Sequence, residues 1–174
     1  PQKGRARFMV QQRAIEMEIS SLPALHGESL TIKILDTGET IPRIKDLEFL
    51  PDDLTRLHKL LWLPQGMILV CGPPANGKTT TLYAMAHELS RHQRKITTIE
   101  ESIEYQLKDA HQVQINEQAG LTFSQALKSV LKHHPNVILL GEIRDKETAE
   151  IAMKAAQTGH MVQSIIRADD VMST

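Results

Sequence analysis

The pattern of hydrophobic positions changes character part-way along the chain. In the first part apolar and polar residues alternate, so that Ile15, Met17 and Ile19 share one face while acidic residues share the other. Such alternation is typical of antiparallel strands with one exposed face. The alternating segments are residues 5–10, 14–20 and 30–35. The pattern therefore predicts a small β-rich unit over residues 1–36.

Later apolar runs are unbroken, and helical patterns separate them. The runs "MILVC" (residues 67–71) and "NVILL" (residues 136–140) are bounded by Gly or Pro, as strands covered on both faces are. The segments "KITTIE" and "MVQSII" are interpreted as further strands. Apolar residues recur at helical spacing at Leu82, Met85, Ala86 and Leu89, and at Phe123, Ala126, Leu127, Val130 and Leu131. This order predicts an α/β fold with a mostly parallel sheet over residues 51–174.

Three helix starts and one linker follow from local signals. Thr122, with Gln125 three residues later, predicts a capping box. We expect Asp52 to cap a short helix that carries Leu54, Leu57 and Leu61. We expect another helix to start at Asp145 and to bury Ala149, Ala152, Met153 and Ala156. The turn-rich segment "TGETIPRIKDLEFLPDD" contains two prolines, so residues 37–50 are predicted to link the two units.

Composition narrows the classes of function. The 174 residues carry a formal net charge of -1 and no block of Lys or Arg, which argues against a nucleic-acid partner. The single cysteine, Cys71, permits no internal disulfide and fits a reducing compartment. No apolar run approaches the roughly 18 residues that span a bilayer, so no membrane span is expected. Because the first residue is Pro1 and not Met, we expect a fragment of a longer protein.

The stretch "CGPPANGKTT" at residues 71–80 predicts a nucleotide-binding loop. Gly72, Gly77, Lys78 and Thr79 satisfy the G-x-x-x-x-G-K-[ST] pattern between a buried strand and a helix, which is the context of a P-loop. Backbone N–H groups from Asn76 to Thr80 can face the β-phosphate, and Gly77 permits their close approach. Lys78 would balance phosphate charge and Thr79 would offer a hydroxyl to Mg²⁺.

Two groups of carboxylates are candidates for the chemistry. Glu142 follows the strand in "VILLGEIRD", at the sheet edge where open α/β folds bind ligands, and could orient or deprotonate the attacking water. The alternative is a solvated carboxylate at a strand end. The segment "IEESIEY" concentrates Glu100, Glu101 and Glu104, which could hold the outer shell of Mg²⁺ or form a solvated acidic run. We interpret His133 and His134 as structural residues at a helix end.

Four ordered motifs together resemble the secretion-ATPase superfamily, and within it the type II secretion and type IV pilus assembly ATPases. They are "GPPANGKTTTLYA", "TIEESIEY", "GLTFSQALKSVLKHHPNVILLGEIRDKETAEIA" and "AAQTGHMVQS". The upstream "ISSLPALHGESLTIKIL" resembles the end of the small α+β N-terminal domain of such proteins. The resemblance implies a RecA-like core and a homohexameric, Mg²⁺-dependent ATPase. It also implies a cytoplasmic, peripheral position at a bacterial inner membrane, with a platform protein as partner.

The resemblance also implies roles for single residues. Lys78 and Thr79 would contact phosphate and Mg²⁺, and Glu142 would be the catalytic carboxylate. Glu100 and Glu101 would be the acids of the Asp box, and His160 the first residue of the His box. The chain departs from the family pattern at Ala75 in place of Gly, Glu101-Ser102 in place of Asp-Pro, Asn136 in place of Asp, and Glu18 and Lys33 in place of arginines.

Arg167 stands where the second histidine of the His box is expected. Arginine cannot exchange a proton near neutral pH, which leaves a γ-phosphate contact or a surface pairing with Asp169 or Asp170. Two functions therefore remain. One is a motor that hydrolyses ATP, which the retention of Lys78 and Glu142 favours. The other is a nucleotide-gated structural or regulatory subunit without hydrolysis.

Overall fold

The computed structural model describes residues 2–11, 13–36 and 40–167 and divides the chain into two compact units. Unit 1 comprises Pro1–Thr40 and Glu104–Gln106, and unit 2 comprises Ile41–Ile103 and Leu107–Thr174. The division falls within residues 37–50. The hydrophobic pattern did not predict that residues 104–106 group with unit 1.

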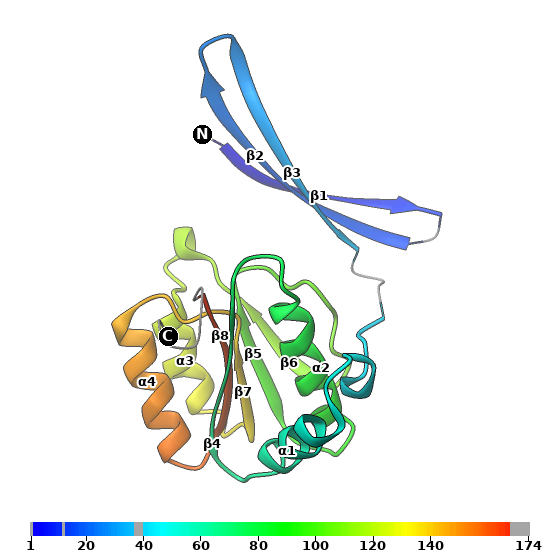
Figure 1. The fold of residues 1–174 in the computed structure, drawn as a ribbon. Helices are drawn as coiled ribbons and strands as arrows, with labels where there is room; N and C mark the ends of the chain where they lie inside the picture. Colours follow the sequence, from blue (N-terminus) through cyan, green and yellow to red (C-terminus); the bar gives the residue numbers. More distant parts are fainter. Residues whose placement is uncertain (1, 12, 37–39, 168–174) are drawn as a thin grey trace. The chain divides into compact units, whose positions relative to one another are not determined.

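Unit 1 contains an antiparallel sheet of three strands in the order β1-β2-β3 (Figure 1). The strands are β1 (Gln2–Val10), β2 (Arg13–Ala24) and β3 (Gly27–Asp36). Met17 pairs with Ile34 and Ile19 with Ile32, so the apolar residues form one face across the sheet. All three strands are longer than predicted, and the β2–β3 ladder continues up to the turn at residues 25–26.

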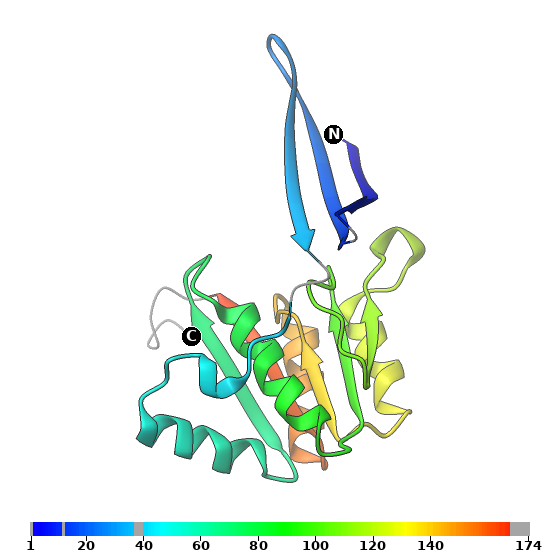
Figure 2. The same ribbon diagram turned by 90° about the vertical axis from the view of Figure 1, so that its right-hand side faces the viewer.

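Unit 2 contains a parallel sheet of five strands in the order β4-β8-β7-β5-β6. The strands are β4 (Gly66–Gly72), β5 (Ile96–Glu100), β6 (Ala110–Gln114), β7 (Val137–Leu140) and β8 (Met161–Arg167). The helices are α1 (Pro51–Leu61), α2 (Lys78–Ser90), α3 (Phe123–Leu131) and α4 (Lys146–Gln157), with the 3-10 turns η1 (Ile44–Asp46) and η2 (Glu117–Ala119). Helix α2 covers one face of the sheet, and α3 and α4 cover the other (Figures 1 and 2). The predicted α/β class is confirmed.

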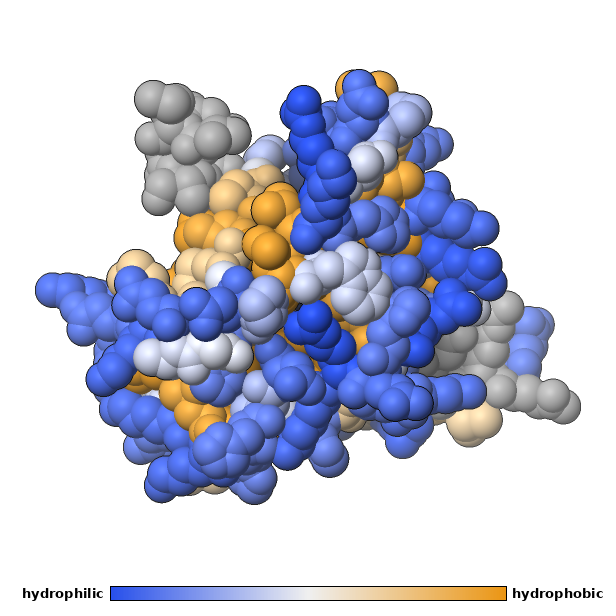
Figure 3. Space-filling model, turned by 90° about the horizontal axis from the view of Figure 1, so that it is seen from below, coloured by the Kyte–Doolittle hydropathy of each residue, from blue (hydrophilic) through white to orange (hydrophobic). Residues whose placement is uncertain are grey.

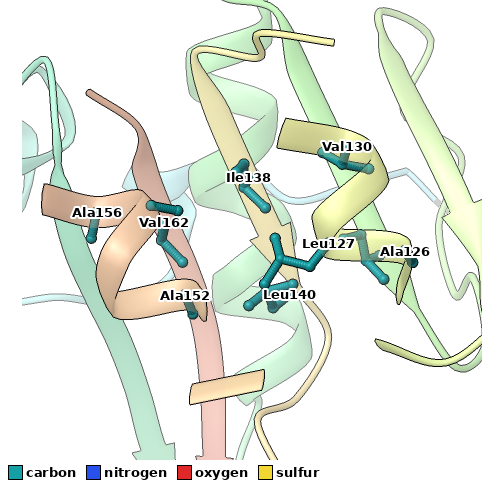
Figure 4. Close-up of a cluster of buried hydrophobic side chains, with 10 residues drawn as sticks. Ala126, Leu127, Val130, Ile138, Leu140, Ala152, Ala156 and Val162 are labelled. Atoms are coloured by element: carbon teal, nitrogen blue, oxygen red, sulfur yellow. The ribbon is translucent and has the colours of Figure 1, made fainter. Parts of the chain in front are cut away.

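The core on the α3–α4 face joins both helices to the three central strands (Figure 4). Leu127 of α3 and Ala152 of α4 are fully buried against Ile138 and Leu140 of β7 and Val162 of β8. The alanines of α4 let this helix approach the sheet closely. On the opposite face, the predicted stripe of α2 is buried at Leu82, Met85, Ala86 and Leu89. This packing fixes the strands whose ends carry the candidate site residues.

Local signals placed two helix starts correctly and one incorrectly. The Thr122 side chain accepts from the Gln125 N–H at 3.3 Å, and Asp145 is the N-cap of α4. The prediction that Asp52 caps α1 is wrong, because Leu50 is the N-cap and Pro51 takes the first helical position. The prediction that Met153 is buried is also wrong: it is 50% exposed, and Ala155 is buried in its place.

Gln163 of β8 is a fully buried polar residue in the middle of the sheet. Its register partners are Ile68 of β4 and Leu139 of β7, so its neighbours on both sides are apolar. Within the described part of the chain, neither its Nε2 nor its Oε1 has a hydrogen-bond partner. A buried amide without partners costs about 1–3 kcal/mol of stability.

Replacing this amide with an apolar side chain of similar size should stabilise unit 2. We expect Gln163→Leu to raise the free energy of unfolding by about 1–2 kcal/mol, because the substitution removes two polar atoms that have lost water. Urea unfolding of parent and variant measures the difference. A lower free energy of unfolding in the variant would show that the amide has a stabilising partner.

No helix in the described ranges is both long and apolar enough to cross a membrane. The face in Figure 3 is mostly hydrophilic, with apolar areas between hydrophilic residues.

Candidate active site

The candidate residues converge because parallel strands end at a common edge of the sheet. The P-loop follows β4, Glu101 follows β5, Glu142 follows β7, and Arg167 ends β8. Gly72 and Arg167 are register partners, so the last residue of β8 lies beside the start of the P-loop. Ligands of open α/β sheets bind at this carboxyl edge.

The predicted P-loop, residues 72–79, runs from the end of β4 into the first turn of α2. Gly77 is the N-cap of α2 with φ 72°, a left-handed conformation that glycine adopts without strain. The Thr81 N–H donates to the Gly77 carbonyl at 2.9 Å, which starts the helix there. The first turn of α2 therefore directs its N–H groups and the positive end of the helix dipole toward the loop. The Lys78 ammonium donates to the Pro73 carbonyl within the same loop.

Ala75 adopts a left-handed conformation within the P-loop. Its φ is 61°, at a position where the family pattern has glycine. An L-residue with a Cβ is strained there by roughly 1–2 kcal/mol relative to the right-handed region. The strain lies in the segment that would wrap a phosphate.

Glycine at position 75 should relieve this strain. We expect Ala75→Gly to raise the free energy of unfolding by about 1 kcal/mol, measured by urea unfolding. Gln93→Gly is a matched control, because Gln93 also has a positive φ, 58°, but lies outside the P-loop. This substitution should raise the free energy of unfolding by a similar amount. If Ala75→Gly destabilises the protein while Gln93→Gly stabilises it, the alanine methyl makes contacts that outweigh the strain.

The Glu142 carboxylate is held by two arginines. Its Oε1 accepts from the Arg167 Nε and its Oε2 from the Arg144 Nε, both at 2.7 Å. Arg144 also donates through Nη2 to the Glu101 Oε2 at 2.7 Å. The Glu142 side chain is 12% exposed, whereas that of Arg167 is 65% exposed. The site is thus a chain of charges across the ends of β5, β7 and β8.

Gly141 lies against the end of β5. A Cβ on Gly141 would lie 3.4 Å from the Glu100 Cα and 3.5 Å from the Ile99 carbonyl oxygen. The Gly141 N–H donates to that carbonyl at 2.8 Å, which extends the pairing of β7 with β5 beyond the strand. A Cβ at position 141 would therefore make ordinary van der Waals contact, and the strand ends that carry Glu101 and Glu142 are held together by the backbone pairing.

Glu100 is buried beneath α2 and is 3% exposed. Its Oε1 accepts from the Thr98 hydroxyl at 2.6 Å and from the Gln112 Nε2 at 3.4 Å, and its Oε2 accepts from the Tyr83 hydroxyl. Both carboxylate oxygens are therefore engaged by side chains of β5, β6 and α2. This arrangement argues against direct contact of Glu100 with a metal ion.

His160 and Asn136 lie at the opposite edge of the sheet. His160 immediately precedes β8 and its Nδ1 lies 3.2 Å from the Ala155 carbonyl, whereas Arg167 ends the same strand. At about 3.3 Å per residue, the strand separates the two by roughly 20 Å. The Asn136 Oδ1 accepts from the Lys95 N–H at 2.9 Å and ties the starts of β5 and β7 together. The structure does not bring His160 together with the other predicted catalytic residues.

The residues at this edge suit a magnesium ion that is bound mainly by ATP and water, with few ligands from the protein. The described residues contain no group of three or more His, Cys, Asp or Glu that could hold a metal ion. Mg²⁺ commonly takes one or two protein oxygens and completes its shell with substrate phosphates and water. Thr79, in the first turn of α2, can supply such an oxygen beside the loop.

A family model described as "Type II/IV secretion system protein" matches residues 1–174. The chain belongs to this family. Among its curated relatives, the type IV pilus assembly ATPase PilB of Acinetobacter baylyi is 41% identical over all of this chain and 30% of its own length. The type II secretion system protein E of Xanthomonas campestris pv. campestris is 39% identical over 98% of this chain and 30% of its own length. The resemblance inferred from the four motifs is confirmed.

Solved structures agree with the membership in the type II/IV secretion system family. The pilus retraction motor PilT with bound ADP has a TM-score of 0.78 and 31% identity over 95% of this chain and 48% of its own. The Legionella pneumophila ATPase DotB has a TM-score of 0.76 at 23% identity, which supports the fold. The chain spans about a third of the length of the curated relatives named here and about half of the solved ones.

Sequence reasoning missed two residues of the site. Arg144 stands two positions after Glu142 in "GEIRD", and Tyr83 lies on the predicted buried side of α2. The signal for Arg144 was its place in a loop between a strand-end carboxylate and a helix cap. Its two partners come from different strands, so their identity required the sheet order.

Proposed function

We propose that this chain belongs to an ATP-binding and hydrolysing motor subunit that powers type IV pilus assembly or type II protein secretion. The observation that carries the proposal is the convergence of the P-loop and Glu142 at one edge of the sheet, in a member of the type II/IV secretion system family. The motor would act as a homohexamer in the cytoplasm, peripheral to a bacterial inner membrane. A platform protein of that membrane would be its partner, without nucleic acid.

Each residue role follows from its position. The P-loop residues Gly72, Asn76, Gly77, Lys78, Thr79 and Thr80 would bind the phosphates through backbone N–H groups and the Lys78 charge. Thr79 would hold Mg²⁺, which when bound neutralises phosphate charge, and Glu100 would act in its outer shell. Glu142 would orient the attacking water and accept its proton. Since His160 lies at the other edge, we propose that it supports the fold by its contact with Ala155.

One observation favours the alternative of a subunit that binds nucleotide without hydrolysis. Both oxygens of Glu142 are paired with arginines, so a water competes with two charged donors for the carboxylate. The deciding experiment is ATP turnover by the full-length protein, with and without its membrane platform protein. Turnover in either condition supports the motor. Nucleotide binding without turnover in both conditions supports the alternative.

Arg167 is proposed to contact the γ-phosphate when ATP is bound. Its side chain is largely exposed and its present partner is Glu142; Asp169 and Asp170 lie outside the described residues. A guanidinium can exchange a carboxylate for a phosphate because both accept paired hydrogen bonds. We therefore expect Arg167→Ala to weaken ATP binding about tenfold more than ADP binding, since a charge-assisted hydrogen bond contributes about 1.5–3 kcal/mol.

Titration calorimetry with both nucleotides measures this discrimination. Arg56→Ala is the matched control, because Arg56 is an exposed arginine of α1 that pairs with Asp53 within its own helix. Arg167→His should recover part of the discrimination. An equal loss of affinity for ATP and ADP in Arg167→Ala would contradict the γ-phosphate contact.

A further inference from the structure

Arg144 bridges two carboxylates that belong to different strands. Its Nε donates to the Glu142 Oε2 and its Nη2 to the Glu101 Oε2, each at 2.7 Å. Glu142 follows β7 and Glu101 follows β5, and these strands are neighbours in the sheet. Arg167 contacts the other oxygen of Glu142. Arg144 therefore links the acid after β5 to the acid after β7.

The backbone on both sides of Arg144 is fixed. The Ile143 N–H donates to the Ile165 carbonyl of β8 at 3.2 Å. Asp145 caps α4 by accepting from the Thr148 N–H at 2.8 Å, and this hydrogen bond is the main cause that lowers the pKa of Asp145. Such anchoring limits the positions that the guanidinium of Arg144 can reach.

The Glu101 end of the bridge is anchored as well. The Gln114 Nε2 of β6 donates to the Glu101 carbonyl at 3.0 Å. The Glu101 side chain is 49% exposed, whereas the Glu142 side chain is 12% exposed. The Glu101 side chain is therefore more exposed to solvent than that of Glu142, which is mostly buried at the strand end. Arg144 contacts both.

The chemistry of arginine suits this bridge. The guanidinium is planar and presents several N–H donors in fixed directions, so that Nε and Nη2 can serve two acceptors at once. The pKa of Arg144 is raised, chiefly by its hydrogen bond with Glu142, with Glu101 adding to the effect. Arg144 is therefore charged at any working pH. A lysine has one nitrogen and cannot hold both carboxylates in the same geometry.

We propose that Arg144 is a positioning residue that joins Glu101 to Glu142, so that Glu101 acts on hydrolysis through Arg144 and not as a direct ligand of Mg²⁺. The inference rests on the proposed function, in which Glu142 is the base. A carboxylate that must face a water molecule is sensitive to displacement, since an error of about 1 Å can cost 100-fold in rate. Glu101 fixes Arg144, and Arg144 fixes the Oε2 side of Glu142.

The test is steady-state ATP hydrolysis by the full-length protein with its platform protein. The variants are Glu101→Gln, Arg144→Gln and the double variant, together with Arg144→Lys. Each single Gln variant should lower kcat by about 10- to 100-fold and leave KM for ATP within about threefold. The double variant should be no slower than the slower single variant, because both substitutions break one link. Arg144→Lys should recover little of the loss.

Three results would overturn the inference. The first is an unchanged kcat in Arg144→Gln. The second is a double variant in which the two losses multiply, which would mean that the residues act independently. The third is a raised Mg²⁺ requirement in Glu101→Gln alone, which would make Glu101 a metal ligand.

Two further measurements separate this inference from the proposed function. Lys128→Gln is the control for loss of a surface ion pair, because Lys128 pairs with Glu147 at 2.6 Å between α3 and α4, and neither residue is assigned to the site. It should leave kcat unchanged. If the parent protein hydrolyses no ATP, the proposed function and this inference fail together. If the parent is active and Glu142→Gln is inactive while Arg144→Gln is fully active, only this inference fails.

Discussion

Lys78→Ala is expected to remove ATP binding, raising the dissociation constant by at least about 100-fold. Removing one partner of a close, desolvated charge pair typically costs 2–5 kcal/mol, and about 2.7 kcal/mol corresponds to 100-fold. Lys78 is the first residue of α2 and the only lysine of the loop, so no neighbour in "GPPANGKTT" can replace its charge. Titration calorimetry with ATP measures the effect.

The matched control for this change is Lys146→Ala. Lys146 also occupies the first turn of a helix, α4, but its side chain is 90% exposed and its partner is Glu150. ATP affinity should stay at the parent level in this variant. Urea unfolding shows whether Lys78→Ala is folded, because Lys78 also donates to the loop carbonyl of Pro73. A folded Lys78→Ala protein that binds ATP normally would remove the basis of the P-loop assignment.

Glu142→Gln is expected to keep ATP bound while turnover falls by about 100-fold or more, the usual scale for loss of a positioned base. Glutamine has nearly the same size as glutamate, and its amide oxygen can still accept from one of the two arginines. It cannot take a proton from water at neutral pH. The effect should therefore appear in kcat and leave the dissociation constant for ATP nearly unchanged.

Steady-state hydrolysis and titration calorimetry on the same preparation separate these two quantities. Glu150→Gln is the control, since Glu150 is an exposed carboxylate of α4 whose partner is Lys146 of the same helix. Turnover at the parent level in Glu142→Gln would leave Glu142 as a strand-end carboxylate that serves only to pair with Arg144 and Arg167.

Features set by a few adjacent residues could be predicted from the sequence. The predicted P-loop lies between β4 and α2, because the pattern from Gly72 to Thr79 marks both the strand end and the helix start. Thr122 and Asp145 cap their helices through contacts three residues ahead. The prediction that Asp52 caps α1 was wrong because Pro51 suits the first helical position, so the N-cap is the residue before it, Leu50.

Features that depend on distant strands could not be predicted. Glu142 and Arg144 follow β7, whereas Glu101 follows β5 and Arg167 ends β8. Their pairing requires the order β4-β8-β7-β5-β6, which periodicity does not contain. The prediction for Met153 was wrong for a similar reason. Helix α4 carries apolar residues at both 153 and 155, and packing against the sheet buries the side with Ala155. Sequence placed His160 and Arg167 in one motif, whereas β8 separates them across the length of the sheet.

The buried amide of Gln163 bears on how much sequence change the protein can tolerate. A domain typically has a net stability of about 5–15 kcal/mol, and a side chain that costs about 1–3 kcal/mol takes a visible share of it. Unit 2 has correspondingly less reserve against later substitutions, most of which destabilise. In a cell a lower free energy of unfolding reduces the abundance of the folded protein, even when every residue of the site is intact. The core of unit 2 therefore tolerates fewer destabilising substitutions than it would with an apolar residue at position 163.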